Sequence, residues 1–446
     1  MKVRNATMTR RRFLAATAGA GAMLAAPAFV PSSALGKDGG VAASERITVG
    51  GIGINGHGAY VLGALLSLPD TQFVAVCDVR ADRRKAVKET VDAKNGNQDC
   101  ATYRDLRELL ARPDIDAVLI ATGDRWHALA SIMAAKAGKD VYCEKPCSMS
   151  MGESRALAET MQRYGRVFQV GTQRRTIDSF KFAVDLARSG KLGKLHTLHA
   201  SLAFYGGAPN GEAVRHDWLP TEPEPPKETL DWNLWLGPAP WRPHNRAYAA
   251  GTMGWLSHFD FNAGGGFLNW ASHTVDLCQW ANQTDGTTPI EFEPVGAAGG
   301  YTTKRVVHGR YANGVKLVMR PHDDKDWLPL GSCQVRFEGE EGWVETGDSN
   351  EVAVYPETLR AERTVFAKVG TLPTSHLRNF FDCVKSRAQP VTNADIARSS
   401  HVASHAAAIA WMLDRKVAFD PATETFLDDD EANRMRTRPM RDSWQM

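Results

Sequence analysis

The sequence predicts two domains after a short leader: an α/β domain with a parallel sheet at residues 45–170, then an α+β domain at residues 171–446 with a large, open and mainly antiparallel sheet. In the first part, short apolar runs alternate with helical segments, which favours right-handed crossovers and a parallel sheet. In the second part, paired strand-like runs flank turn signals such as Asn313-Gly314, which are typical of antiparallel hairpins.

The first 36 residues are predicted to be a targeting signal and not part of the fold. Arg10 and Arg11 precede Phe13, Leu14 and a weakly apolar stretch rich in Ala and Gly, which is the pattern of a bacterial twin-arginine signal. The stretch is too short to span a bilayer, which requires about 20 apolar residues. We therefore expect removal of residues 1–36, export of the folded chain by the twin-arginine machinery, and a periplasmic or other extracytoplasmic location.

Composition gives no indication of a nucleic-acid or membrane partner. The formal net charge is +2, and much of that excess lies in the signal, so nucleic acid and anionic membranes are not expected as partners. No segment after the signal is long and apolar enough to cross a membrane. The seven cysteines are an odd number and lie mostly inside apolar runs, so we expect buried small side chains and no disulfide framework.

The segment from Arg46 to Asp78 predicts a dinucleotide-binding βαβ unit of the Rossmann type. Gly51, Gly53 and Gly56 follow a β-branched run, and a second apolar strand ends in Asp78, 22 residues after Gly56. The first glycine of such a turn allows a tight bend, the second a close approach to a pyrophosphate, and the third close packing of helix and strand. Asp78 would then accept hydrogen bonds from the adenosine ribose.

The remaining elements continue both patterns. In the first domain we expect helices at 81–95, 103–111, 126–137 and 151–164, and strands at 116–121, 140–143 and 167–170. In the second domain we expect a helix at 180–189, a strand at 194–205, a proline-rich loop at 206–230, hairpins within 305–320 and 333–346, and closing helices at 375–387 and 392–413.

Catalytic chemistry is expected where the second domain meets the strand ends of the first. Glu144-Lys145-Pro146 directly follows the strand DVYC, so Lys145 would face a bound nicotinamide. Its ammonium could bind a substrate hydroxyl and stabilise the alkoxide that forms as hydride leaves. On position alone, a surface lysine in a turn is equally compatible with the sequence. The chain has no HExxH motif and no paired CxxC motif, so no metal site is predicted.

A series of motifs resembles the Gfo/Idh/MocA oxidoreductases, which are named for glucose-fructose oxidoreductase and inositol dehydrogenase. The motifs are GIGING at the glycine turn, IATGDRWHALA at 120–130, EKP at 144–146, VGTQRR at 170–175, LDWNLWLGPAP at 230–240 and GGGFLNWASHTVDLCQW at 264–280. The last two, with NFFDCVKSR at 379–387, resemble the branch of this family that is rich in exported bacterial members.

The resemblance implies roles for individual residues. Gly51, Gly53, Gly56 and Asp78 would bind the dinucleotide, and Glu144 and Lys145 would lie beside it, with Lys145 joined to proline in an unusual backbone geometry. Thr122, Trp126 and His127 would line the nicotinamide side. The family's D-x-x-x-H element falls on Asn269 and His273, the latter on a helix expected to begin near Ser272. His273 would take the hydroxyl proton during oxidation, because imidazole titrates near neutral pH.

Two positions depart from the family's pattern. Asn269 replaces the aspartate that much of the family has, and an amide can orient a hydroxyl but cannot accept its proton. The proton transfer then falls to His273 and Lys145. Gly123 stands where the family commonly has proline.

The resemblance implies an NAD(P)-dependent oxidoreductase that acts on a hydroxyl of a sugar, cyclitol or glycoside. Because free cofactor is scarce outside the cytoplasm, an exported enzyme would keep its cofactor bound. We expect NAD, since Asp78 would repel the 2′-phosphate of NADP; NADP is the alternative because Arg80 could offset that repulsion. Two other functions stay open: an NAD-assisted glycoside hydrolase with transient hydride chemistry, and a non-catalytic sugar-binding or scaffold protein. An open sheet face also favours a homo-oligomer.

Overall fold

The computed structural model describes residues 41–203, 214–296, 305–360, 366 and 374–446. Residues 1–46 and residues 47–446 form two separate units. In the first unit, η3 (Ala43–Glu45) precedes Arg46, whose Nε donates to the carbonyl oxygen of Val41 at 2.9 Å. The expected signal, residues 1–36, lies outside the described residues.

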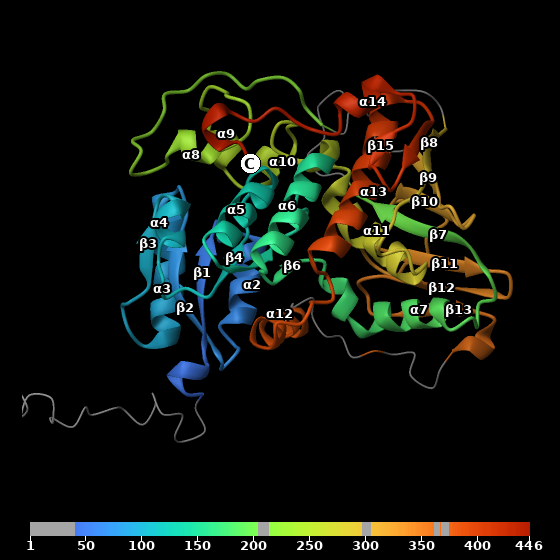
Figure 1. Cartoon of the computed structure of the whole chain (residues 1–446), viewed down its shortest axis with the longest axis horizontal. Helices are drawn as coiled ribbons and strands as arrows, with labels where there is room; N and C mark the ends of the chain where they lie inside the picture. Colours follow the sequence, from blue (N-terminus) through green and yellow to red (C-terminus); the bar gives the residue numbers. More distant parts are fainter. Residues whose placement is uncertain (1–40, 204–213, 297–304, 361–365, 367–373) are drawn as a thin grey trace, which may run out of the picture. The chain divides into compact units, whose positions relative to one another are not determined.

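The second unit begins with a six-stranded parallel sheet in the order β3-β2-β1-β4-β5-β6 (Figure 1). The chain proceeds outward from β1 through β2 and β3, then returns to the other side of β1 with β4. Ligands of such sheets bind at the carboxyl ends of the strands near this reversal. The strands are β1 (Ile47–Ile52), β2 (Thr71–Cys77), β3 (Ala101–Tyr103), β4 (Ala117–Ile120), β5 (Asp140–Cys143) and β6 (Phe168–Val170).

Helices cover both faces of this sheet, because successive strand residues point to opposite sides. In β4, Ala117 and Leu119 pack on one face, and Val118 and Ile120 on the other. The first face is covered by α2 (His57–Leu65), α3 (Ala81–Asn95) and, from far along the chain, α12 (Thr374–Ser386). The second face is covered by α4 (Leu106–Leu110), α5 (Asp124–Lys136) and α6 (Met151–Tyr164).

The structure confirms the predicted α/β arrangement and corrects one element. The helix expected over 103–111 is divided, because Tyr103 ends β3, which pairs with β2. The helix α4 begins only after Asp105, whose carboxylate accepts from the Arg107 backbone amide at 2.9 Å and caps it. Strand pairing at the start of the segment therefore outweighs its helix propensity.

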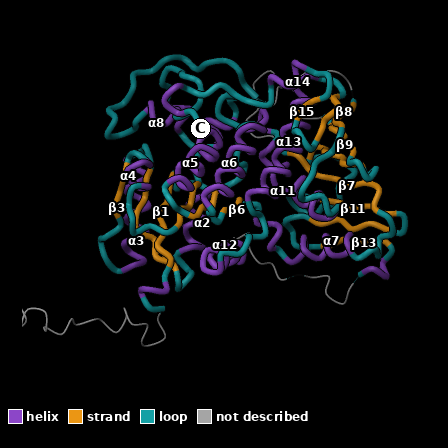
Figure 2. The backbone as a smooth tube through the Cα atoms, in the orientation of Figure 1, coloured by secondary structure: helices purple, strands orange, loops and turns teal. Residues whose placement is uncertain are grey.

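A second sheet has nine strands in the order β13-β12-β11-β7-β10-β9-β8-β14-β15 (Figure 2). Its pairings are antiparallel apart from β7 with β10, which is parallel. Both expected hairpins are present, β9–β10 across Asn313-Gly314 and β11–β12 across Glu340-Glu341. The strands are β7 (Leu195–Leu202), β8 (Glu291–Val295), β9 (Val306–Arg310), β10 (Lys316–Pro321), β11 (Val335–Gly339), β12 (Gly342–Thr346), β13 (Val352–Tyr355), β14 (Val417–Asp420) and β15 (Thr425–Phe426).

One face of this sheet packs against three helices and forms the largest apolar cluster. The helices are α7 (Asp178–Arg188), α11 (Leu268–Ala281) and α13 (Ala394–Leu413). The small alanines of α13 allow close contact with α11 and α6, and Trp411 fills the space near Phe267. This packing fixes α11, the helix that carries Asn269 and His273.

Several short elements have no counterpart in the sequence prediction. The two long C-terminal helices do not close the fold, because β14, β15, α14 (Asp430–Arg434) and η7 (Asp442–Trp444) follow them. The long connection before α11 contains α8 (Trp232–Leu236), α9 (Arg246–Ala249) and α10 (Thr252–Leu256), and 3-10 turns lie at η4 (Gln173–Thr176), η5 (Ala263–Gly266) and η6 (Glu357–Leu359). Residues 214–230 of the expected loop form no helix and only two isolated bridges, whereas 206–213 lie outside the described residues.

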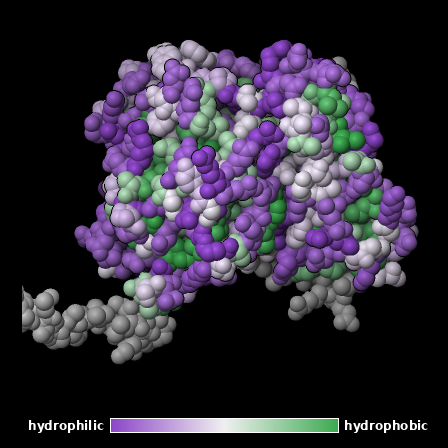
Figure 3. Space-filling model, viewed as in Figure 1, coloured by the Kyte–Doolittle hydropathy of each residue, from purple (hydrophilic) through white to green (hydrophobic). Residues whose placement is uncertain are grey.

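All seven cysteines are buried and unpaired, as expected for small core side chains. Hydrophilic residues cover most of the face shown in Figure 3, and the hydrophobic ones lie in separate patches. Among the described residues, no helix has the length and hydropathy that a membrane span requires.

Candidate active site

The glycine-rich turn joins β1 to α2 in a conformation that requires glycine. Gly53 has a φ of 72°, and a Cβ on it would lie 2.4 Å from Cγ2 of Thr122. Gly51 lies in β1, where a Cβ would be 2.5 Å from the Phe73 ring. The close contact between helix and strand belongs to Gly58, whose Cβ would lie 2.6 Å from that of Ala121. Gly56 has a φ of 52° and precedes α2, so its role is the turn itself and not the packing expected of the third glycine.

Asp78 stands at the carboxyl end of β2, directly beside this turn. The carboxylate is 6% exposed, and its Oδ1 accepts from the backbone amide of Arg80 at 2.9 Å. Burial raises the pKa of Asp78, and the positive charges of Arg83, Arg80 and Arg84 act in the opposite direction. The side chain of Arg80 is held elsewhere, because it binds Asp82 and the Ala249 carbonyl oxygen.

A pocket of about 760 Å³ runs from Asp78 along the glycine-rich turn. Its walls come from the first domain and from distant segments of the second, including three tryptophans: Trp235 of α8, Trp255 of α10 and Trp444 of η7. Trp126 lies in this wall. Its Nε1 donates to the Leu234 carbonyl oxygen at 3.0 Å, and its ring meets Trp444 edge-on at 4.9 Å.

A second pocket of about 790 Å³ adjoins the first and shares Asn55, Thr122 and Trp255 with it. Lys145, which follows β5, lies here, and its Nζ donates to the backbone carbonyl oxygen of Asn269 at 3.2 Å. The Lys145-Pro146 peptide bond is cis. The structure therefore brings Lys145 and the start of α11 together in this second pocket.

Glu144 occupies a tight position next to Lys145. Its side chain is buried, and its Oε1 lies 3.6 Å from Nε2 of His57. A Cβ on Gly171 would lie 2.7 Å from this oxygen, so the glycine after β6 makes room for the carboxylate.

Asn269 and His273 lie four residues apart on α11 and therefore face the same side. The helix begins at Leu268, not near Ser272 as the sequence suggested, and only Phe267 separates it from the glycine-rich turn η5. Both side chains are buried, and Nδ2 of Asn269 and Nδ1 of His273 have no hydrogen-bond partner among the described residues. Burial lowers the pKa of His273 well below its usual value, and Arg174 and Lys145 act in the same direction.

Arg174 brings a second cation near His273. Its guanidinium binds Asp348 at 3.0 Å through Nε and at 2.7 Å through Nη2. The pair joins η4 to the turn after β12 and lies against Cys333, whose thiol pKa is raised to about 12 by burial.

His127 connects the ends of two central strands. Its Nδ1 lies 2.7 Å from the Pro146 carbonyl oxygen, and its Nε2 lies 3.1 Å from that of Thr122. Burial lowers the pKa of His127 to about 4, so the ring is neutral at neutral pH. His127 thus holds the loop of Lys145 against the end of β4.

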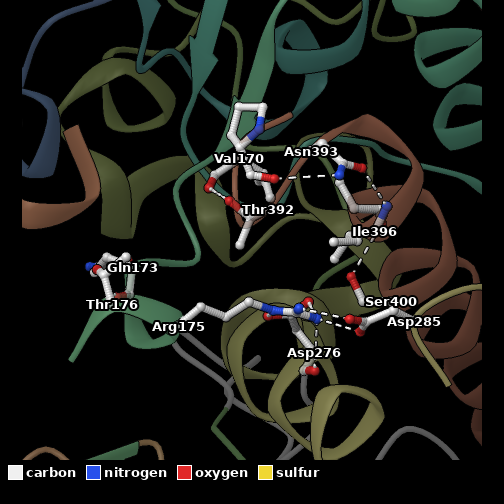
Figure 4. A network of polar contacts seen from close by, with 12 residues as sticks. Val170, Gln173, Arg175, Thr176, Asp276, Asp285, Thr392, Asn393, Ile396 and Ser400 are labelled. Carbon is white, nitrogen blue, oxygen red and sulfur yellow. Dashed lines mark hydrogen bonds and ion pairs between the residues drawn. The ribbon is translucent and has the colours of Figure 1, made fainter. Parts of the chain in front are cut away.

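The helix α11 is anchored by an ionic contact one turn beyond His273 (Figure 4). Arg175 of η4 binds Asp276 through Nε at 2.7 Å and through Nη2 at 2.8 Å, and Nη2 also binds Asp285 at 2.6 Å. Arg175 and Asp276 are almost fully buried. This contact fixes α11 relative to the loop that follows β6.

Two residues of the site have no separate signal in the sequence. Asp124 lies in the pocket of Lys145, accepts from the Ala263 backbone amide at 3.0 Å, and has its pKa raised to about 7 by burial. Only its place inside IATGDRWHALA could have indicated it. Trp444 lies two residues from the end of the chain, and nothing in its surroundings predicts contact with α5. In the described part of the chain, no three His, Cys, Asp or Glu side chains are grouped as metal ligands.

The fold and this cleft define a Rossmann-type, dinucleotide-binding protein. A family model described as "Oxidoreductase family, NAD-binding Rossmann fold" matches residues 47–172, and one described as "Oxidoreductase family, C-terminal alpha/beta domain" matches residues 214–446. The chain therefore belongs to the Gfo/Idh/MocA oxidoreductase family, and its first domain is of the NAD-binding type.

Similar proteins differ in their named activities. A myo-inositol 2-dehydrogenase of Thermotoga maritima is 31% identical over 150 residues, which cover 34% of this chain and 43% of the relative. A glycosyl hydrolase family 109 protein of Saccharopolyspora erythraea is 34% identical over 129 residues, 28% of each chain. The chain thus spans less than half the length of these curated relatives. The structure of scyllo-inositol dehydrogenase from Lactobacillus casei with bound NAD(H) and scyllo-inositol has a TM-score of 0.59 at 16% identity, covering 84% of this chain and 99% of that one, which shows a shared fold.

Proposed function

We propose that this protein transfers hydride between a tightly held nicotinamide cofactor and a hydroxyl of a sugar, cyclitol or glycoside. The observation that carries the proposal is the meeting of Lys145 with α11, where Nζ of Lys145 binds the Asn269 carbonyl oxygen one turn before His273. The pocket at Lys145 adjoins the glycine-rich turn. A substrate bound there would lie beside the cofactor, and hydride transfer requires this proximity.

A dinucleotide is supported by the lining of the pocket, because the glycine-rich turn at Gly53 and the strand-end carboxylate of Asp78 line it together. When bound, the nicotinamide supplies the hydride acceptor. His273 is neutral at neutral pH, since its pKa is lowered by burial, and it accepts the hydroxyl proton. The ammonium of Lys145 stabilises the developing alkoxide. Asn269 offers an amide that orients the hydroxyl without taking its proton.

A polyhydroxylated substrate is supported by the unpartnered polar atoms near Lys145. Oε1 of Glu144, Nδ2 of Asn269 and Nδ1 of His273 are buried and have no hydrogen-bond partner among the described residues. Such groups are costly when left alone, and neighbouring hydroxyls of a polyol would satisfy them. The similar proteins named for inositol support the same class of substrate.

Retention of the cofactor is supported by the origin of the pocket walls. Trp235, Trp255 and Trp444 come from three separate segments and line the cleft at Asp78. Contacts with three separate segments would slow release of the cofactor. We further propose NAD as the preferred cofactor, export by the twin-arginine route, and a homo-oligomer formed through the sheet face opposite α7, α11 and α13.

A second candidate is a glycoside hydrolase that oxidises a sugar hydroxyl, eliminates the leaving group and returns the hydride. It is favoured by the similarity to a glycosyl hydrolase family 109 protein and by the advantage of a redox-neutral cycle with a retained cofactor. The same residues would serve in both reactions, so the geometry of Lys145 and His273 alone does not separate them.

The test is incubation of the purified protein with polyols, sugars and aryl glycosides. Oxidation predicts a rise in absorbance of the reduced cofactor without release of the aglycone. Hydrolysis predicts aglycone release without a net change in the cofactor. Sugar binding without either signal would contradict both catalytic proposals and support a binding or scaffold role.

A further inference from the structure

Gly123 follows Thr122 in the loop between β4 and α5. Because it has no side chain, it leaves a space that the side chain of Arg125 fills. A Cβ built on Gly123 would lie 2.5 Å from Nη1 and 3.4 Å from Cζ of Arg125. Any larger side chain at residue 123, including the proline that the family commonly has there, would displace this guanidinium. The glycine and the arginine therefore form one structural arrangement.

The guanidinium of Arg125 is buried and positively charged. Its group lies 3.8 Å from the centre of the Trp235 ring, and Nε donates to the Trp235 carbonyl oxygen at 2.9 Å. Among the described residues, Arg125 forms no ion pair within 4 Å, and Nη1 has no hydrogen-bond partner. Burial lowers the pKa of Arg125 to about 9, and Asp124 acts in the opposite direction. An anion in the pocket that Arg125 lines would balance this charge.

The position of Arg125 identifies that anion by its chemistry. Arg125 and Gly123 line the same pocket as Gly53, Thr122 and Asp78. Asp78 lies at the ribose end, and the turn at Gly53 is where the backbone approaches a diphosphate. A guanidinium suits phosphate oxygens because it is planar and has several donors.

We propose that Arg125, whose guanidinium occupies the space left by Gly123, binds the diphosphate of the dinucleotide. This inference rests on the proposed use of a nicotinamide cofactor. The diphosphate would then bind a charged side chain in addition to the backbone amides of the turn and α2. It provides a specific reason for retention, since the cofactor removes an otherwise unmatched buried charge. Trp235 then holds the guanidinium flat at the pocket wall.

The experiment compares ligands that differ only in phosphate. Calorimetry measures binding of NAD⁺, ADP and adenosine to the mature protein freed of nucleotide, as wild type and as Arg125→Met. Loss of a charged hydrogen bond predicts that NAD⁺ and ADP bind about 10- to 100-fold more weakly, with adenosine changed by less than about threefold. Nucleotide retained per chain after dialysis gives a second readout and is expected to fall in the same variant.

Gly123→Ala tests the arrangement with Arg125 still present, because the new Cβ pushes the guanidinium away. It should reproduce the phosphate-selective loss, and Arg125→Lys should keep part of the ADP affinity. Should Arg125→Met fail to fold, these two variants decide the question. Arg320→Met is the matched control, since Arg320 also stacks on a tryptophan, Trp327, at 3.9 Å, but does not line the pocket.

Equal weakening of adenosine and ADP would overturn the proposal and assign Arg125 to packing on Trp235. Unchanged NAD⁺ affinity in both Arg125→Met and Gly123→Ala would overturn it as well. Because binding is measured without turnover, a protein that binds NAD⁺ but oxidises no polyol contradicts the proposed function and leaves the result for Arg125 intact.

Discussion

Nζ of Lys145 donates to the backbone carbonyl oxygen of Asn269 at 3.2 Å and so joins the end of β5 to the first turn of α11. The two residues are separated by 124 positions in the chain. This contact places the ammonium one helical turn before His273, and the proposed chemistry depends on that placement.

His273→Ala tests the proton acceptor. Loss of a general base predicts that turnover falls by a factor on the order of 100 to 10,000, while NAD⁺ affinity stays near wild type. Steady-state rates and calorimetry measure the two effects. His199→Ala is the control, because His199 is largely buried as well but contacts Glu338 on β11. Full activity in His273→Ala would move proton transfer to Lys145 or another group, and the site model would be abandoned.

Asn269→Asp tests the same assignment through pH. Oxidation requires neutral imidazole, so its rate falls where pH drops below the pKa of His273, which lies well below the usual value. A carboxylate at position 269 would stabilise the imidazolium and raise this pKa. The acid limb of kcat/KM should therefore move to higher pH. Asn269→Ala, which adds no charge, should leave the limb in place, and an unmoved limb in Asn269→Asp would argue against His273 as the base.

Asp78→Ser tests cofactor choice. The carboxylate of Asp78 repels a 2′-phosphate, whereas Arg83 lies in the same pocket and would attract one. Removal of the carboxylate should shift the ratio of NAD⁺ to NADP⁺ affinity towards NADP⁺ by at least about tenfold. Calorimetry with both nucleotides gives the ratio. If the wild-type protein is isolated with mainly NADP, the role of Asp78 is wrongly assigned.

Arg175→Met tests the anchor of α11. It leaves the buried carboxylate of Asp276 without its cation, and such a change lowers the free energy of unfolding by about 3–5 kcal/mol. Arg310→Met is the matched control, because the Arg310–Glu291 pair lies at the surface, where loss of an ion pair has little effect on the free energy of unfolding. Denaturant unfolding of both variants measures the difference. Equal losses would show that the burial of the Arg175 pair has no energetic consequence.

Local patterns predicted most regular elements, because alternation and helical periodicity are written along the chain. The helix α3 and the strand β5 agree with expectation to the residue, since a charged face and a buried run mark them. The short helix α8 is not predicted by helix propensity, because aromatic contacts such as Trp232 stacked on Trp235 stabilise it. The domain boundary at residues 170–171 stays a prediction, because α12 of the second part covers the first sheet.

The candidate site likewise contains some residues that local patterns predict and others that depend on long-range packing. Lys145 and the glycine turn follow strands directly, so their positions could be inferred from the sequence. Trp444 and the contact between Arg125 and Gly123 depend on long-range packing or on the absence of a side chain. Sequence patterns carry no signal for such contacts.

Replacement of both Arg10 and Arg11 by lysine tests export. The export machinery reads the arginine pair, so the variant should remain in the cytoplasm. Arg12→Lys is a close control, because Arg12 adjoins the pair without belonging to it, and it should leave export unchanged. Fractionation followed by immunoblotting locates each variant.

Because this route carries folded proteins, wild-type protein from the periplasm should contain nucleotide that was bound before export. Periplasmic accumulation of the double variant at the wild-type level would show that another route is used.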